Sequence, residues 1–438
     1  MGLALTLCYL PVLEAQNWVR LERHRVAATI ESINSDWSAD ARFFDETTPP
    51  AERNNAWVTF KNGALTRVAE VAGACKRPSI IRSLDFPILE HEGPVAFIED
   101  KKIDMPRFEQ LLERTRLQNH WTNFGPLSRT LETILLELLK LHDSKTVVMC
   151  ASGTAALFGL AGLHAVKAGR RLRWVTSAYT FPCQRIGPFA DAIVVDCDES
   201  GVINLGEVDL LGPQNWDGLI VTNLFGTQRQ INRFQEYAAS HGKRLLIDGA
   251  TALFGVDRSG LGTADEMISF HHTKPWGFGE GGCAIVDKHD EMLLRSIFNF
   301  GLNSSEVPWP YAFNGKLSEI SAASILERLE RLPSWSFFYQ RQRHRILTLA
   351  NAVGLGPLGG INPDSITNSL PLLLPSVIPL DRLSGYRFAV HKYYRPLGLG
   401  HPHADQIYSR IVNVPCHPGM AAISTGELES FFSQLTLE

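Results

Sequence analysis

The sequence has little of what would point to a secreted, metal-binding or membrane protein. Its 438 residues include only seven cysteines, none in a CxxC pair, so we expect reduced thiols and predict no metal site. No apolar run approaches the roughly 20 residues needed to cross a bilayer. The short apolar stretch 3–13 has no basic region before it and is interrupted by Pro11, which argues against a signal peptide. We therefore expect a cytoplasmic location.

An excess of charge of either sign is also missing. The chain has 42 basic and 46 acidic side chains and a formal net charge of -4, which gives no electrostatic reason to expect nucleic acid or an anionic membrane as a partner. A small-molecule substrate fits this balance better. With 45% hydrophobic and 20% charged residues, the composition is that of an ordinary globular chain of about two or three domains.

The middle of the chain alternates apolar runs with helical stretches. Such alternation predicts an α/β fold in which a mostly parallel sheet is covered by helices on both faces. The expected strands and helices, in chain order, are 146–150, 155–167, 172–175, 192–195, 219–223, 232–241, 244–248, 267–270 and 283–286.

The two ends of the chain differ from this middle part. Before residue 100 no chemistry is recognisable, although 18–33 has helix-like spacing and 56–60 favours a strand. Beyond residue 300 a proline-rich connection at 357–379 separates two predicted helices from a terminal helix. The helices are expected at 317–332, at 340–353 and from 424 onward. We therefore expect an N-terminal extension (1–100), a large domain (101–300) and a smaller C-terminal domain (301–438).

Two polar sites follow strands at the edge where ligands collect in open parallel sheets. Gly153 and Thr154, after Ser152, open the helix at 155–167, and the free N–H groups of a first helical turn can bind phosphate. The alternative is an ordinary N-cap, a role that serine and threonine often fill. Asp248 ends the strand at 244–248, although a single aspartate there is also a common turn residue.

Lys274 stands between a strand and an unusually glycine-dense turn, 277–282. A lysine amine must lose its proton before it attacks an aldehyde, which a partly buried pocket favours. The alternative is a solvated surface lysine, but a plain surface hairpin does not need so many glycines. The turn also fits the pattern GxGxxG. It precedes a strand rather than a helix, so we reject a dinucleotide site.

Taken together, these segments resemble the DegT/StrS-like sugar aminotransferases, which have the aspartate-aminotransferase fold (fold type I). Each matching stretch is weak alone, but they occur in the family's order and cover roughly residues 100 to 438. The stretches are Trp121-Thr-Asn-Phe-Gly-Pro, Ser152-Gly-Thr-Ala-Ala-Leu, Ala178-Tyr-Thr-Phe-Pro, Asn223-Leu-Phe-Gly, Leu246-Ile-Asp-Gly-Ala-Thr-Ala-Leu-Phe-Gly, Ser269-Phe-His-His-Thr-Lys, Phe313-Asn-Gly-Lys and Lys392-Tyr-Tyr-Arg-Pro-Leu.

The resemblance implies pyridoxal 5'-phosphate (PLP) as the cofactor, bound by a three-layer large domain beside a smaller α+β domain. Lys274 would hold PLP as a Schiff base and, once released, move the proton during transamination. Asp248 would keep the pyridine nitrogen protonated, so that the ring can accept electrons. Phe181 would stack on the ring face, although from the residues alone it could equally belong to the core.

The resemblance also assigns the phosphate site. Gly153, Thr154 and Ser269 would hold the phosphate, and Asn314 would complete the site of a neighbouring subunit. Without the resemblance, Ser269 could simply end its strand and Asn314 could simply shape a turn. Thr251 stands where the family commonly has a glutamine near the cofactor's phenolic oxygen. The adjacent residues His271 and His272 receive no catalytic role, because imidazoles beside a site more often make structural hydrogen bonds.

The implied function is transfer of an amino group from an amino acid, with glutamate expected, to a nucleotide-linked keto-sugar. The resemblance further implies a homodimer with shared active sites and a role in polysaccharide or O-antigen biosynthesis. Three alternatives stay open: a non-sugar ketone such as a cyclitol, a sugar dehydratase, and a non-catalytic binding module. The dehydratases replace the lysine with histidine, so Lys274 argues against the second. Retention of Lys274 with Asp248 argues against the third.

Overall fold

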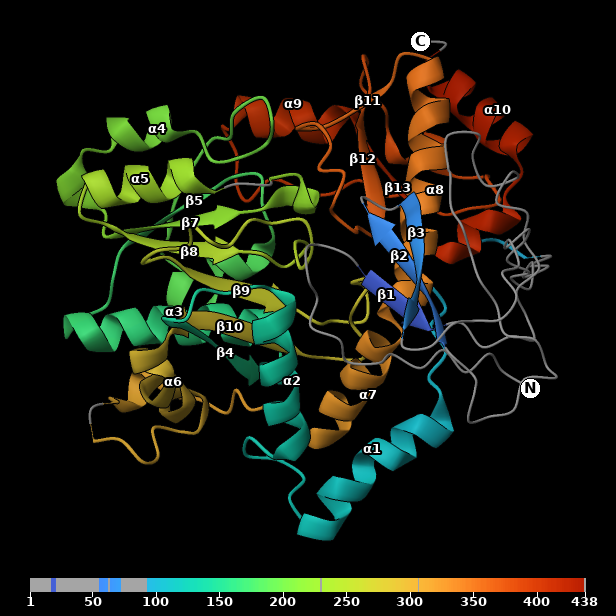
Figure 1. The fold of residues 1–438 in the computed structure, drawn as a ribbon. Helices are drawn as coiled ribbons and strands as arrows, with labels where there is room; N and C mark the ends of the chain where they lie inside the picture. The colour runs from blue at the N-terminus through green and yellow to red at the C-terminus, as the bar shows by residue number, and fades with distance from the viewer. Residues whose placement is uncertain are drawn as a thin grey trace, which may run out of the picture.

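The computed structural model describes residues 93–436 except 229–230 and 306, and it also describes the backbone of three strands nearer the N-terminus (Figure 1). These are β1 (Asn17–Arg20), β2 (Asn55–Lys61) and β3 (Ala64–Val71), which pair antiparallel in that order. Strand β2 confirms the strand predicted at 56–60. The helix predicted at 18–33 is wrong at its start, because 17–20 pairs with β2, and 21–33 lie outside the described residues.

The central sheet of the described chain has seven strands in the order β4-β10-β9-β8-β7-β5-β6. Neighbours from β9 to β6 run parallel, whereas β10 is antiparallel to both β4 and β9. This mostly parallel sheet confirms the predicted α/β class. In chain order the strands are β4 (Lys145–Cys150), β5 (Trp174–Ser177), β6 (Ile193–Val195), β7 (Gly218–Thr222), β8 (Arg244–Asp248), β9 (Asp265–Ser269) and β10 (Gly282–Asp287).

Helices cover both faces of this sheet because its strands are apolar on both sides. In β8, Leu245 and Ile247 pack into one core and Leu246 into the other, as the two-residue period of a strand requires. Figure 1 shows α4 and α5 on one side of the sheet and α3 and α6 on the other. The helices of this unit are α1 (Met105–Gln118), α2 (Pro126–Leu138), α3 (Gly153–Ala168), α4 (Leu205–Leu210), α5 (Asn232–Ser240), α6 (Glu291–Phe298) and α7 (Glu319–Glu330).

A second core surrounds a smaller antiparallel sheet of three strands. Helix α8 joins the two cores, since Trp335 and Tyr339 pack with the central sheet whereas Ile346 and Ala350 pack with the smaller one. The predicted helix at 340–353 therefore begins earlier than expected. The elements are β11 (Gly356–Pro357), β12 (Ser369–Leu373), β13 (Ile411–Pro415), α8 (Leu332–Ala352), α9 (Pro402–Arg410) and α10 (Thr425–Thr436).

Six of the seven strands of the central sheet point in the same direction, so their carboxyl ends lie at one edge of the sheet. Strand β4 shares this direction because both β4 and β9 are antiparallel to β10. The last residues of these six strands are Cys150, Ser177, Val195, Thr222, Asp248 and Ser269. In sheets of this kind, ligands bind at this edge. Among the described helices, none has the length and apolar character that crossing a bilayer requires.

Candidate active site

A cavity of about 430 Å³ opens at the carboxyl edge of the sheet, within the range of small-molecule sites. Residues from strand ends that are far apart in the sequence meet around it. Of the predicted site residues, seven line the cavity and Asn314 does not. The seven are Gly153, Thr154, Phe181, Asp248, Thr251, Ser269 and Lys274.

The N-terminus of α3 forms one end of this cavity. Ser152 is the N-cap, and its Oγ accepts a hydrogen bond from the Ala155 amide at 3.0 Å. The Gly153 and Thr154 amides therefore lie in the first turn, where helix N–H groups and the helix dipole favour an anion. A Cβ at position 153 would lie only 3.0 Å from the Ser269 Cβ. Glycine thus lets Ser269 approach the helix end, and these groups together fit a phosphate.

Asp248 is the buried carboxylate of the site, with 1% of its surface exposed. Oδ1 accepts from the Ala250 amide at 3.1 Å, and Oδ2 accepts from Gln184 Nε2 at 2.8 Å. Burial raises the pKa of Asp248, while these two donors and the charge of Lys274 oppose the rise. A carboxylate held in this way can in turn hold a protonated ring nitrogen.

Gln184 orients Asp248 through a buried hydrogen-bond network. Its Oε1 accepts from the Thr176 hydroxyl, and its Nε2 donates to Thr222 Oγ1 at 2.7 Å as well as to Asp248. Because an ionised carboxylate can only accept hydrogen bonds, the amide nitrogen must face Asp248, and the amide oxygen then faces the hydroxyl of Thr176. Sequence reasoning missed Gln184. The only signal was a polar residue three positions after Phe181, in the segment that follows β5.

Replacing Gln184 by methionine is expected to lower the free energy of unfolding by about 1–3 kcal/mol, because the buried partners Asp248, Thr176 and Thr222 then lack a hydrogen bond. Urea unfolding of the purified protein measures this change. Gln214→Met is the matched control, since Gln214 is exposed and its replacement should shift the value by less than about 0.5 kcal/mol. Equal values for the two variants would refute the network.

Lys274 extends from the turn between β9 and β10 and is partly buried at the cavity. Burial lowers the pKa of its amine, while Asp248 and Cys183 oppose the shift. A lowered pKa favours the neutral amine that can attack an aldehyde. The turn is tight: a Cβ at Gly277 would lie 2.3 Å from the carbonyl oxygens of Phe270 and His271. Gly277 therefore permits a close approach of two backbone segments.

Three other predicted residues lie in distinct settings. Phe181 is 51% exposed, so it lies at the cavity and outside the core. The Thr251 hydroxyl donates to the carbonyl of Asn223 at 2.8 Å, which leaves only its lone pairs for a ligand. Asn314 is exposed, and its backbone forms a bridge with Asn299.

His271 makes local structural contacts. Its Nδ1 accepts from the backbone amide of Thr273 at 3.2 Å and also contacts the Thr273 hydroxyl at 2.9 Å. Its Nε2 lies 3.4 Å from a carboxylate oxygen of Glu280. These bonds are what the sequence reasoning expected of an imidazole beside the site.

Aromatic side chains from outside the central sheet line one side of the cavity. Tyr394 stacks on Phe225 with ring centroids 5.3 Å apart, and Tyr393 lies 5.7 Å from the ring of Phe97. All four side chains line the cavity, together with Ile98. Sequence reasoning assigned no role to these residues, and Phe97 and Ile98 come from the stretch before residue 100 in which no chemistry was recognised.

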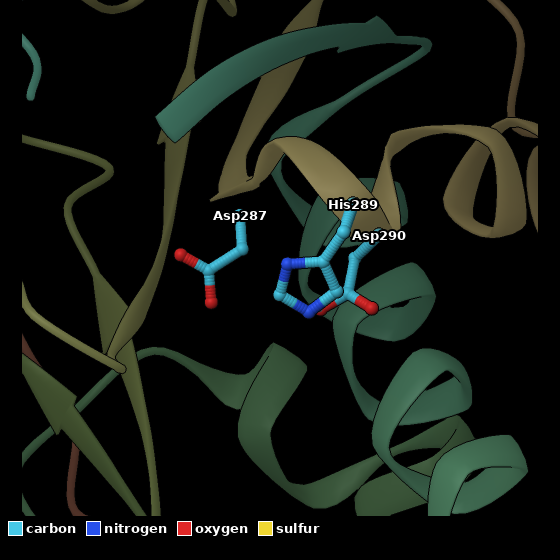
Figure 2. A group of neighbouring side chains, drawn as sticks. All are labelled: Asp287, His289 and Asp290. Atoms are coloured by element: carbon cyan, nitrogen blue, oxygen red, sulfur yellow. The ribbon is translucent and has the colours of Figure 1, made fainter. Parts of the chain in front are cut away.

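Among the described residues, one group of side chains has ligand atoms close enough together to hold a metal ion: Asp287, His289 and Asp290 (Figure 2). Asp287 already pairs with Lys145 at 3.1 Å, and Asp290 pairs with Lys167 at 2.7 Å. Asp287 is the last residue of β10, which runs antiparallel to its neighbours, so the group lies at the sheet edge opposite the cavity. We assign it no metal.

Parts of this chain are similar to known proteins. The model of the DegT/DnrJ/EryC1/StrS aminotransferase family matches residues 103–354. Protein Rv3402c of Mycobacterium tuberculosis is 32% identical over 272 residues, which cover 57% of this chain and only 61% of that protein. The dTDP-4-amino-4,6-dideoxy-D-glucose transaminase of Escherichia coli is 22% identical over 345 residues, which cover 74% of this chain and 87% of that enzyme.

Solved structures give the same result for the fold. The structure of DesI in the presence of its TDP-sugar product matches with a TM-score of 0.65 and 22% identity, covering 78% of this chain and 92% of that chain. A Bacillus cereus protein that is assigned as a PLP-dependent aminotransferase also matches with a TM-score of 0.65, at 17% identity, covering 78% of this chain and 99% of that chain. The likeness confirms the predicted fold type I.

Proposed function

Because the chain belongs to the DegT/DnrJ/EryC1/StrS aminotransferase family, we propose that it is a PLP-dependent aminotransferase. Its reaction moves an amino group from an amino acid, with glutamate as the expected donor, to the ketone of a nucleotide-linked sugar. One observation carries the proposal: Lys274, with its lowered pKa, and the buried Asp248 line the same cavity as the N-terminus of α3.

The donor set of this cavity fits PLP. When bound, PLP supplies an electron sink for proton removal from a carbon beside the transferred nitrogen. Asp248 would hold a proton at the ring nitrogen and keep the ring electron-poor. The neutral amine of Lys274 would hold the cofactor at its aldehyde carbon, and when free it would be placed to move a proton at the carbons that flank the transferred nitrogen. The first turn of α3 and the Ser269 hydroxyl would hold the phosphate.

The proposal of a sugar substrate is based on the names of two similar proteins. The Escherichia coli relative is named as a dTDP-sugar transaminase, and the DesI structure was determined with a TDP-sugar product. Both names support a nucleotide-linked sugar as the acceptor here. A role in polysaccharide or O-antigen biosynthesis and a cytoplasmic location are proposed from the family resemblance and from the sequence. The alternative acceptor is a non-sugar ketone such as a cyclitol.

We also propose a homodimer with shared active sites. Asn314 is exposed and does not line the cavity of its own chain. That position is compatible with a role in the phosphate site of a partner subunit, which is the role that the family resemblance implies.

The substrate class is tested with a panel of acceptors: nucleotide-linked 3-keto and 4-keto sugars and a cyclitol ketone, each with glutamate or glutamine as donor. Mass spectrometry should detect an amino product from at least one nucleotide-linked sugar. The Lys274→Ala protein is the control and should give none. If only the cyclitol ketone gave an amino product, the acceptor would be a cyclitol and not a nucleotide-linked sugar. No product from any pair in the PLP-loaded protein would contradict the proposed reaction.

A further inference from the structure

A second lysine, Lys101, lies against the turn that carries Lys274. Its Nζ donates hydrogen bonds to the backbone carbonyl oxygens of His272 at 2.5 Å, Lys274 at 2.5 Å and Gly277 at 2.7 Å. An ammonium group has three N–H donors, so the three carbonyls use all of them. Only 7% of Lys101 is exposed. A buried cation whose bonds all go to the main chain of one turn is an unusual use of a lysine.

Burial disfavours the charged form of the Lys101 side chain. Burial lowers the pKa of Lys101 to about 7, with smaller contributions in the same direction from Arg328 and Lys274, while Glu99 opposes the shift. The three carbonyl oxygens must therefore offset a desolvation cost. The Lys274 carbonyl also accepts from the Gly277 amide at 3.0 Å, and Lys101 adds a donor for the carbonyls of His272 and Gly277, which suits buried backbone groups.

The segment that brings Lys101 to the turn is held at both ends. At its start, the Val95 amide donates to the Arg387 carbonyl at 2.6 Å, and the Ala389 amide donates to the Val95 carbonyl at 2.8 Å. Further along, Glu99 accepts from Arg328 at 2.5 Å and from the Tyr339 hydroxyl at 3.0 Å. The position of Lys101 is thus set by the smaller unit and by helices α7 and α8.

Arg328 adds a fourth contact to the same turn, since its Nε donates to the carbonyl of Pro275 at 2.9 Å. Two buried cations therefore bind four main-chain carbonyls between His272 and Gly277. A turn containing several glycines would otherwise have many accessible conformations. Held in this way, the turn presents the Lys274 side chain to the cavity from a fixed backbone.

We propose that Lys101 is a positioning residue that fixes the backbone of Lys274, so that the Lys274 amine can reach the aldehyde carbon of PLP. The inference rests on the proposed function, because it concerns capture of that cofactor. Loss of the Lys101 donors should therefore slow the covalent capture of PLP through Lys274. The same loss should leave unchanged the affinity for ligands that occupy the cavity without that bond.

The test compares two forms of the cofactor on Lys101→Met, which keeps the length of the side chain and removes its donors and charge. PLP is captured covalently, and the rate is followed by its visible absorbance. Pyridoxamine 5'-phosphate has no aldehyde, and its dissociation constant is measured by calorimetry. We expect capture of PLP to slow at least about tenfold, because a misplaced reacting group loses effective molarity. The affinity for pyridoxamine 5'-phosphate should change by less than about threefold, a small effect on the scale of binding free energies.

The matched control is Lys102→Met, because Lys102 is the next residue, has a largely exposed side chain and pairs with Asp100 at 3.0 Å. It should behave as the wild type in both measurements. Lys101→Gln keeps two N–H donors for the three carbonyls, so its capture rate should fall between those of the wild type and Lys101→Met. If Lys101→Met does not fold, the same two measurements are made on Lys101→Gln.

Two results would overturn the inference: wild-type capture in both Lys101 variants, or an equal loss for PLP and pyridoxamine 5'-phosphate, which would indicate general damage to the cavity. Failure of the proposed function gives a different pattern, because the wild-type protein would then capture no PLP. That pattern overturns the inference as well.

Discussion

Lys274→Ala is expected to lower the rate of transamination by about 10⁴-fold, the upper end of the effect of removing a positioned acid–base group. In the proposed reaction the same side chain would have two roles, since it would hold the cofactor at its aldehyde carbon and would also move the proton. The measurement is the initial rate of amino-product formation by the PLP-loaded protein, using the best acceptor from the panel. The structure supports this role because burial lowers the pKa of the amine and because the amine lines the same cavity as Asp248.

Lys288→Ala is the matched control, because Lys288 is exposed just beyond the end of β10. This substitution removes a solvent-exposed lysine from the same region of the chain, so the variant should retain the wild-type rate of transamination. Activity within about tenfold of wild type in Lys274→Ala would be too high for loss of the group that carries the proton, and the assignment would then be wrong.

The second large effect is expected for Asp248→Asn, which should lower turnover by about 10³-fold, the scale found when one electrostatic group of an active site is removed. Asparagine has nearly the same shape but no charge, so it cannot keep the ring nitrogen protonated. Cofactor binding should persist in part, because the first turn of α3, Ser269 and Lys274 are unchanged. The measurements are the turnover number and the visible absorbance of bound PLP.

Asp143→Asn is the control for the loss of a carboxylate, because Asp143 is exposed in the loop before β4. Its turnover should equal that of the wild type. Full activity of Asp248→Asn, with PLP bound, would rule out the role of Asp248 at the ring nitrogen. Loss of all bound PLP would instead assign Asp248 to binding, and the electron-sink account would lose its support.

Sequence reasoning predicted the central sheet well, and most of its site residues line one cavity, for a physical reason. Strands that are buried on both faces are continuous apolar runs, so their ends can be found in the sequence. Asp248 and Ser269 end such strands, and Gly153 follows one. Because parallel strands end at one edge, residues at these positions had to meet.

The smaller sheet was harder to predict because its strands contain proline. Pro371 lies inside β12, the central strand of this sheet, and Pro415 ends β13. Proline has no N–H for a ladder and usually argues against a central strand. The stretch 357–379 was therefore predicted as a connection, although β12 lies within it.

The supporting residues of the site could not be predicted because their contacts join distant segments. Lys101 lies in the charged run Asp100-Lys101-Lys102, which is typical of a solvated loop, yet it binds a carbonyl 171 residues away. Gln184 contacts Asp248 from 64 residues away. Neither periodicity nor composition records such pairings. Only the fold brings these side chains together.

We propose above that the amine of Lys274 forms the covalent bond to the cofactor. Borohydride reduction of the PLP-loaded wild-type protein, followed by proteolysis and peptide mass spectrometry, identifies the lysine that forms this bond. We expect a single major adduct, on the peptide that contains Lys274. An adduct on Lys101, on any other lysine, or on none at saturating PLP would rule out this role of Lys274.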